Sequence, residues 1–238
     1  GGTTHTRLVL GFTALFEDRL DEAAEQFESA LDTMRQLDER LPDEAEVVLG
    51  CGEIARRRGA LVEAERRFRQ SLALAEASGD LRHQALAHLS LGRAAIDAGQ
   101  PAVARSVVLV GLGLLARLGN RRGMAEALEI LAGIEPAAGA ARLLGAAEAE
   151  RLVLGAPLSP REEAALDALR HEARAVLGAP ALEAALLDGA TAGLDDVVAT
   201  LLAEAVADEG GRPSGRAGSE PAQPPTTTSV PSSERSSR

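Results

Sequence analysis

The 238-residue sequence contains no tryptophan, no tyrosine and no lysine, and it has a single cysteine, Cys51. The missing lysine excludes a P-loop nucleotide site and any lysine Schiff base. One cysteine excludes an internal disulfide and a multi-cysteine zinc site. The longest apolar run, Val107 to Ala116, is far shorter than the ~18 residues of a membrane helix. These absences remove several classes of enzyme and membrane protein from consideration.

The charge and composition favour an acidic, helical protein. The formal net charge is −11, which opposes binding to a phosphate backbone. Apolar residues make up 45% of the chain, but aromatic residues only 2%, so alanine, leucine and valine must form the core. Strand-forming residues are scarce, whereas Ala, Leu, Arg and Glu are good helix formers. We therefore expect no direct nucleic-acid binding and an all-α fold.

The N-terminus starts Gly-Gly-Thr-Thr-His, without Met and without the basic and apolar segments of a signal peptide. We interpret the chain as part of a longer protein. The single cysteine is compatible with a reducing compartment, and we expect a cytoplasmic location without membrane association.

A repeat of about 40 residues runs through the first half of the chain. Its marker is a glycine, and Gly11, Gly52 and Gly92 are 41 and 40 residues apart. A second marker, alanine, recurs at the same two intervals. The full sets are Leu10, Gly11, Ala23, Phe27 and Ala30; Cys51, Gly52, Ala64, Phe68 and Ser71; and Leu91, Gly92, Ala104, Val108 and Gly111.

Each repeat unit is predicted to be a pair of helices. The apolar residues of 20–37 recur at helical spacing. Gly79-Asp80 and Gly119-Asn120 each combine a left-handed helix stop with the N-cap of the next helix. Pro101 suits the first turn of a helix. The pattern predicts an array over 1–155, with units of about 5–40, 43–79, 81–119 and 120–155, the last one irregular.

Two further segments follow the array. Ser159-Pro160-Arg161-Glu162 is a capping box that opens a helix. Two more helices are expected, from Pro180 and around Leu194, so residues 156–207 form a C-terminal helical cap. Residues 208–238 are rich in Gly, Pro, Ser and Thr, and we predict a disordered tail.

The Leu-Gly and Ala-x3-Phe-x2-Ala skeleton resembles the tetratricopeptide repeat. The unit length resembles the variant in C-terminal arrays of large bacterial LuxR-type transcriptional regulators and related signal-transduction ATPases. Residues 140–149, followed by Leu154-Gly-Ala-Pro-Leu158, are similar to the closing segment of those arrays. The resemblance implies an α-solenoid that serves as a sensor or scaffold, with effector domains upstream. The sequence departs from it because the positions of the first helices that are aromatic in the family are not aromatic here, and because no DNA-reading helix follows.

One motif competes with this interpretation. Residues 107–116 match an apolar strand followed by Gly111-Leu-Gly113-Leu-Leu-Ala116, a dinucleotide-binding fingerprint. That fingerprint needs a strand-helix-strand context, whereas the 40-residue repeat continues through both glycines. We therefore predict a helix here and no nucleotide, metal or other cofactor. No histidine or serine is supported as a catalytic residue, so we expect a protein that is not an enzyme.

A basic cluster is the best candidate for a binding groove. In the repeat register, Glu53, Arg56, Arg57 and Arg93 fall on the first helices of successive units, toward the concave side that such arrays use for ligands. Arginine holds a carboxylate by two hydrogen bonds, so an acidic peptide is the expected ligand. The alternative is a solvated helix end, because arginines stabilise the negative end of a helix that stops at Gly59.

The first helix is a candidate edge for stacking. Leu8, Phe12, Leu15 and Phe16 recur at helical spacing, and no earlier unit in this chain covers them. An exposed apolar patch of this kind marks an interface, so we expect self-association or stacking on upstream domains. The alternative is that the rings fold inward onto Phe27.

Two functions remain open. The first is protein or peptide recognition on the concave face of the array. The second is sensing of a small-molecule effector within a larger regulatory ATPase. A protein partner predicts a groove open along several units, and a small effector predicts one closed pocket at one junction.

Overall fold

The computed structural model describes the backbone of residues 2–37 and 43–211. Within these ranges every regular element is a helix and there is no β-strand, which confirms the all-α prediction. The helices are α1 (Gly2–Phe16), α2 (Leu20–Leu37), α3 (Glu44–Arg57), α4 (Leu61–Ser78), α5 (Leu81–Asp97), α6 (Pro101–Arg117), α7 (Arg121–Ala132), α8 (Ala137–Leu154), α9 (Pro160–Leu177) and α10 (Ala179–Gly211).

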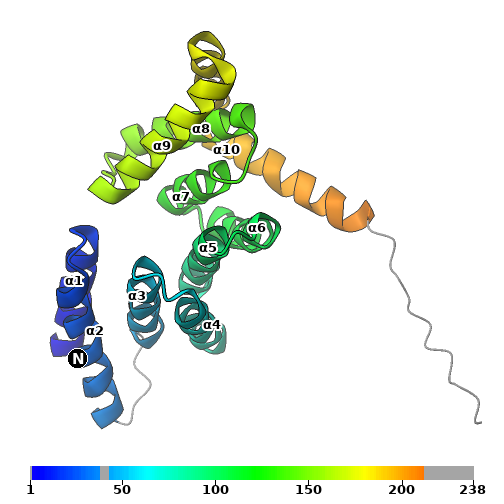
Figure 1. Ribbon diagram of the computed structural model, residues 1–238. Coiled ribbons are helices and arrows are strands. Elements are labelled where there is room, and N and C mark those ends of the chain that lie inside the picture. Colours follow the sequence, from blue (N-terminus) through cyan, green and yellow to red (C-terminus); the bar gives the residue numbers. More distant parts are fainter. Residues whose placement is uncertain (1, 38–42, 212–238) are drawn as a thin grey trace, which may run out of the picture.

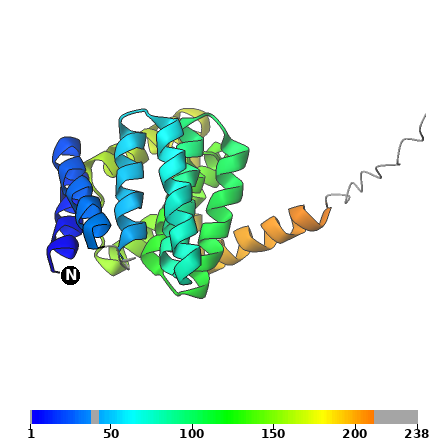
Figure 2. The ribbon, with the colours of Figure 1, turned by 90° about the horizontal axis from the view of Figure 1, so that it is seen from below.

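The helices form a curved array in which each packs on the next along the chain from α1 to α9 (Figure 1). Additional contacts join α1 to α3, α3 to α5 and α5 to α7, so the first helices of successive pairs are neighbours. Figure 1 shows α3, α5 and α7 along the inner side of the curve, with α4 and α6 outside. Figure 2 shows the helices side by side, and the last part of α10 projects away from them.

The glycines of the sequence repeat all make the same contact. A Cβ on Gly11 would lie 2.6 Å from the Phe27 ring, and one on Gly52 would lie 2.5 Å from the Phe68 ring. On Gly92 it would collide with Val108. In each pair, the glycine of the first helix makes room for the large side chain of the second. This shared packing is the physical reason for the two markers that recur together.

The predicted helix boundaries are confirmed. Gly79 ends α4 with a φ of 71°, and the Asp80 side chain accepts a hydrogen bond from the His83 backbone N–H at the start of α5. The Asn120 side chain does the same for α7. Pro101 begins α6. The predicted capping box opens α9: the Ser159 N–H donates to the Glu162 carboxylate at 2.8 Å.

The C-terminal helices agree with the prediction but extend further than expected. The two helices expected after α9 are both present within α10 and are separated by a kink at Gly193, where φ is 80° and ψ is 164°. The backbone of α10 remains helical to Gly211, beyond the expected start of the tail at residue 208. Residues 212–238 of the predicted tail lie outside the described part of the chain.

α8 and α10 cross at two glycines. A Cβ on Gly145 would lie 2.8 Å from the carbonyl carbon of Leu186, and one on Gly189 would lie 2.8 Å from that of Arg142. Both obstructing groups are backbone, which cannot rotate away as a side chain can. The two helices therefore approach closely only because neither residue has a side chain.

Candidate functional site

Residues 107–116 lie within α6, so the strand required by a dinucleotide fingerprint does not exist. Gly111 instead faces α5, since its Cβ would lie 3.1 Å from the Ala85 carbonyl oxygen. Among the described residues, no group of three or more His, Cys, Asp and Glu is placed to hold a metal ion. Over the same ranges, no helix is long and apolar enough to cross a membrane.

The predicted groove residues on α3 lie close together and are paired with carboxylates of this chain. Glu53 accepts hydrogen bonds from Arg56 at 2.8 Å and from Arg57 at 2.6 Å. Arg56 also donates to Asp97 at the end of α5, at 2.6 Å. Arg57 also donates to the Leu15 carbonyl oxygen at the end of α1, at 2.8 Å. The two arginines therefore join α3 to both neighbouring first helices.

Further charged residues continue this cluster along the inner side. Arg93 of α5 pairs with Glu126 of α7 at 2.8 Å. Arg151 of α8 pairs with Glu129 of α7, and both side chains are only 10% exposed. We call these residues, with Glu162 of α9, the inner charged cluster: Glu53, Arg56, Arg57, Arg93, Glu126, Glu129, Arg151 and Glu162. The predicted quartet is part of this cluster, but sequence spacing did not identify the other four residues.

α9 brings its N-terminal turn to this inner side. Glu162 is partly buried there. Burial raises its pKa, but hydrogen bonds to Ser159 and the charges of Arg93 and Arg151 outweigh this effect and lower the pKa. Arg161 lies 4.0 Å from Asp18, in the turn between α1 and α2. In Figure 1, α9 extends from α8 toward the top of the first pair. The segment expected to cap the end of the array thus also reaches its beginning.

Glu53 is the most perturbed acid of the cluster. Burial alone would raise its pKa, but hydrogen bonds from Arg56 and Arg57 and the charge of Arg93 lower it from 4.5 to about 2. A carboxylate that loses its proton more easily in the folded state stabilises the fold above its unfolded pKa. That contribution disappears as the pH falls from 4.5 toward 2.

We therefore expect Glu53→Gln to lower the free energy of unfolding by about 3 kcal/mol at neutral pH. The difference from the parent should shrink as the pH falls from 4.5 toward 2, as measured by urea denaturation at several pH values. Glu25→Gln removes the same charge from an exposed position, and its effect on the free energy of unfolding should not change over this pH range. A constant difference across this range would contradict the assignment.

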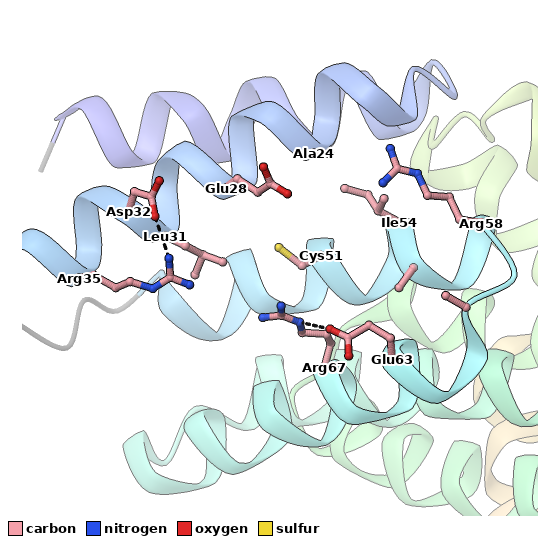
Figure 3. A pocket seen from close by; sticks show the side chains of 12 residues that line it. Ala24, Glu28, Leu31, Asp32, Arg35, Cys51, Ile54, Arg58, Glu63 and Arg67 are labelled. Atoms are coloured by element: carbon pink, nitrogen blue, oxygen red, sulfur yellow. Dashed lines mark hydrogen bonds and ion pairs between the residues drawn. The ribbon is translucent and has the colours of Figure 1, made fainter.

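A second feature lies on the outer side, where α2 and α4 flank α3. It is a cavity of about 550 Å³, and its lining includes Leu31, Cys51, Ile54 and Ala55, which we call its apolar floor. Figure 3 shows Glu28 and Cys51 projecting into the space between α2 and α3, with Glu63 and Arg67 on the α4 side. We call this cavity the outer crevice.

The outer crevice has an explanation in the repeat. Cys51 occupies the position that Leu91 and Leu131 occupy in the next two units, 40 and 80 residues later. Leu91 and Leu131 pack against neighbouring helices. The smaller thiol leaves space between α2 and α4. Cys51 is partly buried, and this burial raises the pKa of its thiol, which opposes a role as a nucleophile.

The predicted N-terminal edge needs a correction. Leu8 and Leu15 are buried at 5% and 4% exposure, and the Phe12 ring packs edge-on against Phe27 with centroids 5.1 Å apart. Only Phe16 of the predicted four is exposed. Helix rotation places Val9 and Leu10 outward with it, at about half exposure. Self-association through this edge stays a prediction.

Among the described residues, His83 is paired with carboxylates, and no histidine belongs to a group that could hold a metal ion. His83 is buried, and its ring nitrogens lie 2.6 Å from Asp80 and 3.3 Å from Glu46. These carboxylates raise the pKa of His83. The pairs join the start of α5 to Glu46 of α3, so the role of His83 is to hold these two helices together.

Comparisons with known proteins identify no relative. No family model matches the chain, and no curated protein or solved structure shows significant similarity to it.

Proposed function

We propose that this chain is a non-catalytic interaction or sensor region of a bacterial transcription-regulatory or signalling protein, acting in the cytoplasm. In this proposal the helical pairs are tetratricopeptide-like units of an α-solenoid, closed by a C-terminal helical cap. The partner is a protein or peptide on the inner side of the curve. The observation that carries the proposal is the inner charged cluster, because its side chains come from five helices, α3, α5, α7, α8 and α9, and combine both signs of charge.

The pairing within the cluster limits how a ligand can bind. Arg56, Arg57 and Arg93 are each already bonded to a carboxylate of this chain. A ligand carboxylate must replace one of these partners. The gain in binding free energy is therefore smaller than that from an ion pair formed with an unpaired arginine. Arg93 is the best candidate, because its side chain is 26% exposed, against 12% and 11% for the other two.

The expected result is that a fluorescein-labelled amphipathic peptide of leucine and glutamate binds the protein. A triple alanine variant of Arg56, Arg57 and Arg93 should weaken binding by about tenfold, as expected for lost charge-assisted hydrogen bonds. Fluorescence anisotropy measures this directly. The matched control replaces Arg66, Arg69 and Arg122, which are exposed and carry the same total charge.

Equal weakening by both triple variants would show that overall charge, rather than the inner cluster, governs binding. Because Arg56 and Arg57 also join helices, circular dichroism must show that the first variant is folded. If the triple variant is unfolded, the single variant Arg93→Gln provides the test instead. A folded variant that binds with unchanged affinity contradicts the groove assignment.

The second candidate function is sensing of a small-molecule effector. The outer crevice favours it, because about 550 Å³ at the junction of the first two helical pairs falls in the size range of small-molecule sites. The same crevice is open to solvent along its rim of charged side chains, which is more typical of a peptide groove than of the closed pocket that this function predicts.

A further inference from the structure

The outer crevice combines an apolar floor with a charged rim. Leu31, Ile54 and Ala55 supply aliphatic side chains to its lining, and Cys51 lies among them. Burying an aliphatic side chain on such a floor is favourable because it removes apolar surface from water. The floor thus suits the apolar face of a ligand.

Most charges around the outer crevice already have partners. Asp32 accepts from Arg35 at 2.7 Å, and Glu63 accepts from Arg67 at 2.8 Å (Figure 3). Arg58 is directed to Asp21, outside the lining. The remaining charge of the rim is the carboxylate of Glu28.

Glu28 has no hydrogen-bond or ion-pair partner among the residues that the structure describes, although it lies close enough to Cys51 to affect the thiol. A free carboxylate beside an apolar floor is complementary to a cation attached to an apolar group. The net charge of −11 adds a long-range attraction for basic partners.

We propose that the outer crevice binds a basic amphipathic peptide segment, with an aliphatic side chain on the floor at Cys51 and Ile54 and a cationic side chain paired with Glu28. This site lies on the opposite side of α3 from Glu53 and its arginines, and its ligand has the opposite charge. The proposal therefore stands apart from that for the inner charged cluster, and either can fail without the other.

The probe is a fluorescein-labelled amphipathic peptide of leucine and arginine, compared with the same peptide carrying glutamate in place of arginine. The basic peptide should bind, and Glu28→Gln should weaken its binding by about tenfold, the loss of one charge-assisted hydrogen bond. Glu25→Gln is the matched control: it removes the same charge from an exposed site on α2 outside the lining, and it should leave binding unchanged.

A second variant tests the floor. Cys51→Leu installs the residue of the two following units and fills the space, so it should abolish binding while the protein stays folded with unchanged or higher thermal stability. In the parent, Cys51 is the only thiol, so a thiol-directed reagent reports on this site alone. The basic peptide should slow its reaction and the acidic one should not. This measurement remains decisive if Cys51→Leu fails to fold.

Three results would overturn the proposal. Equal weakening by Glu25→Gln and Glu28→Gln would reveal only general attraction to an acidic surface. Protection of Cys51 by a simple aliphatic amine as effectively as by the peptide would define a small-molecule site. A dimer seen by sedimentation without peptide, and lost in Cys51→Leu, would mean that a second copy of the chain fills the crevice.

Discussion

Gly145→Val is expected to lower the free energy of unfolding by at least about 3 kcal/mol, the upper end of the cost of overpacking. The reason is the crossing of α8 and α10, where the new side chain would meet the backbone of Leu186. The helices would have to separate, which would expose Leu182 and the apolar surface around it. Thermal denaturation should show a fall in Tm of about 6–12 °C.

The control for this prediction is another glycine of the same helix. A Cβ on Gly139 would meet nothing closer than 3.5 Å, from Glu135. Gly139→Ala should therefore be neutral or stabilise the protein by up to about 1 kcal/mol through helix propensity. If Gly145→Val were as stable as the parent, the close crossing of α8 and α10 would be wrong.

Phe27→Ala is expected to lower the free energy of unfolding by about 3–5 kcal/mol, as for other buried phenylalanines. Phe27 is fully buried, and its ring fills the space left by Gly11 in its own pair and by Gly50 in the next. Loss of the ring opens a cavity at the junction of the first two pairs. Urea denaturation should show the loss, and hydrogen exchange should show faster opening of α1 and α2 than of α7 and α8.

Phe16→Ala is the matched change, because Phe16 belongs to α1 but is 43% exposed. It should cost less than about 1 kcal/mol. Similar losses in both variants would mean that the first pair is held by its exposed edge rather than by Phe27.

The repeat was predictable because it depends on local packing. Gly52 and Phe68 touch within one pair of helices, so their spacing in the sequence reflects the crossing of the two helices. Asp80 and Ser159 were predictable for the same reason, since each caps a backbone N–H three residues away. The exposed edge of α1 was predicted less well. Spacing identifies an apolar stripe but not its rotation, and Leu8 proved buried while Leu10 proved exposed.

The candidate sites were only partly predictable. The repeat register placed Arg56 and Arg93 on one side of the array, but it could not show that Glu53 and Glu126 already hold them. Nor could it locate the outer crevice, because that space depends on the difference between Cys51 and Leu91 at one position of the repeat. Comparing equivalent positions of the repeat units would have shown the smaller side chain of Cys51 and so predicted the outer crevice.

The sequence by itself determined the helices, their ends and the pairing of neighbours, because these depend on propensities, caps and contacts within about 40 residues. Only the tertiary structure showed which helices far apart in the sequence contact one another. Arg161 reaches Asp18, Glu162 approaches Arg93, and Gly145 meets Leu186 through the curvature of the whole array and the crossing of α8 and α10. The positions of these distant helices depend on the packing angles between all the helices that separate them. No local pattern of residues predicts the combined effect of those angles.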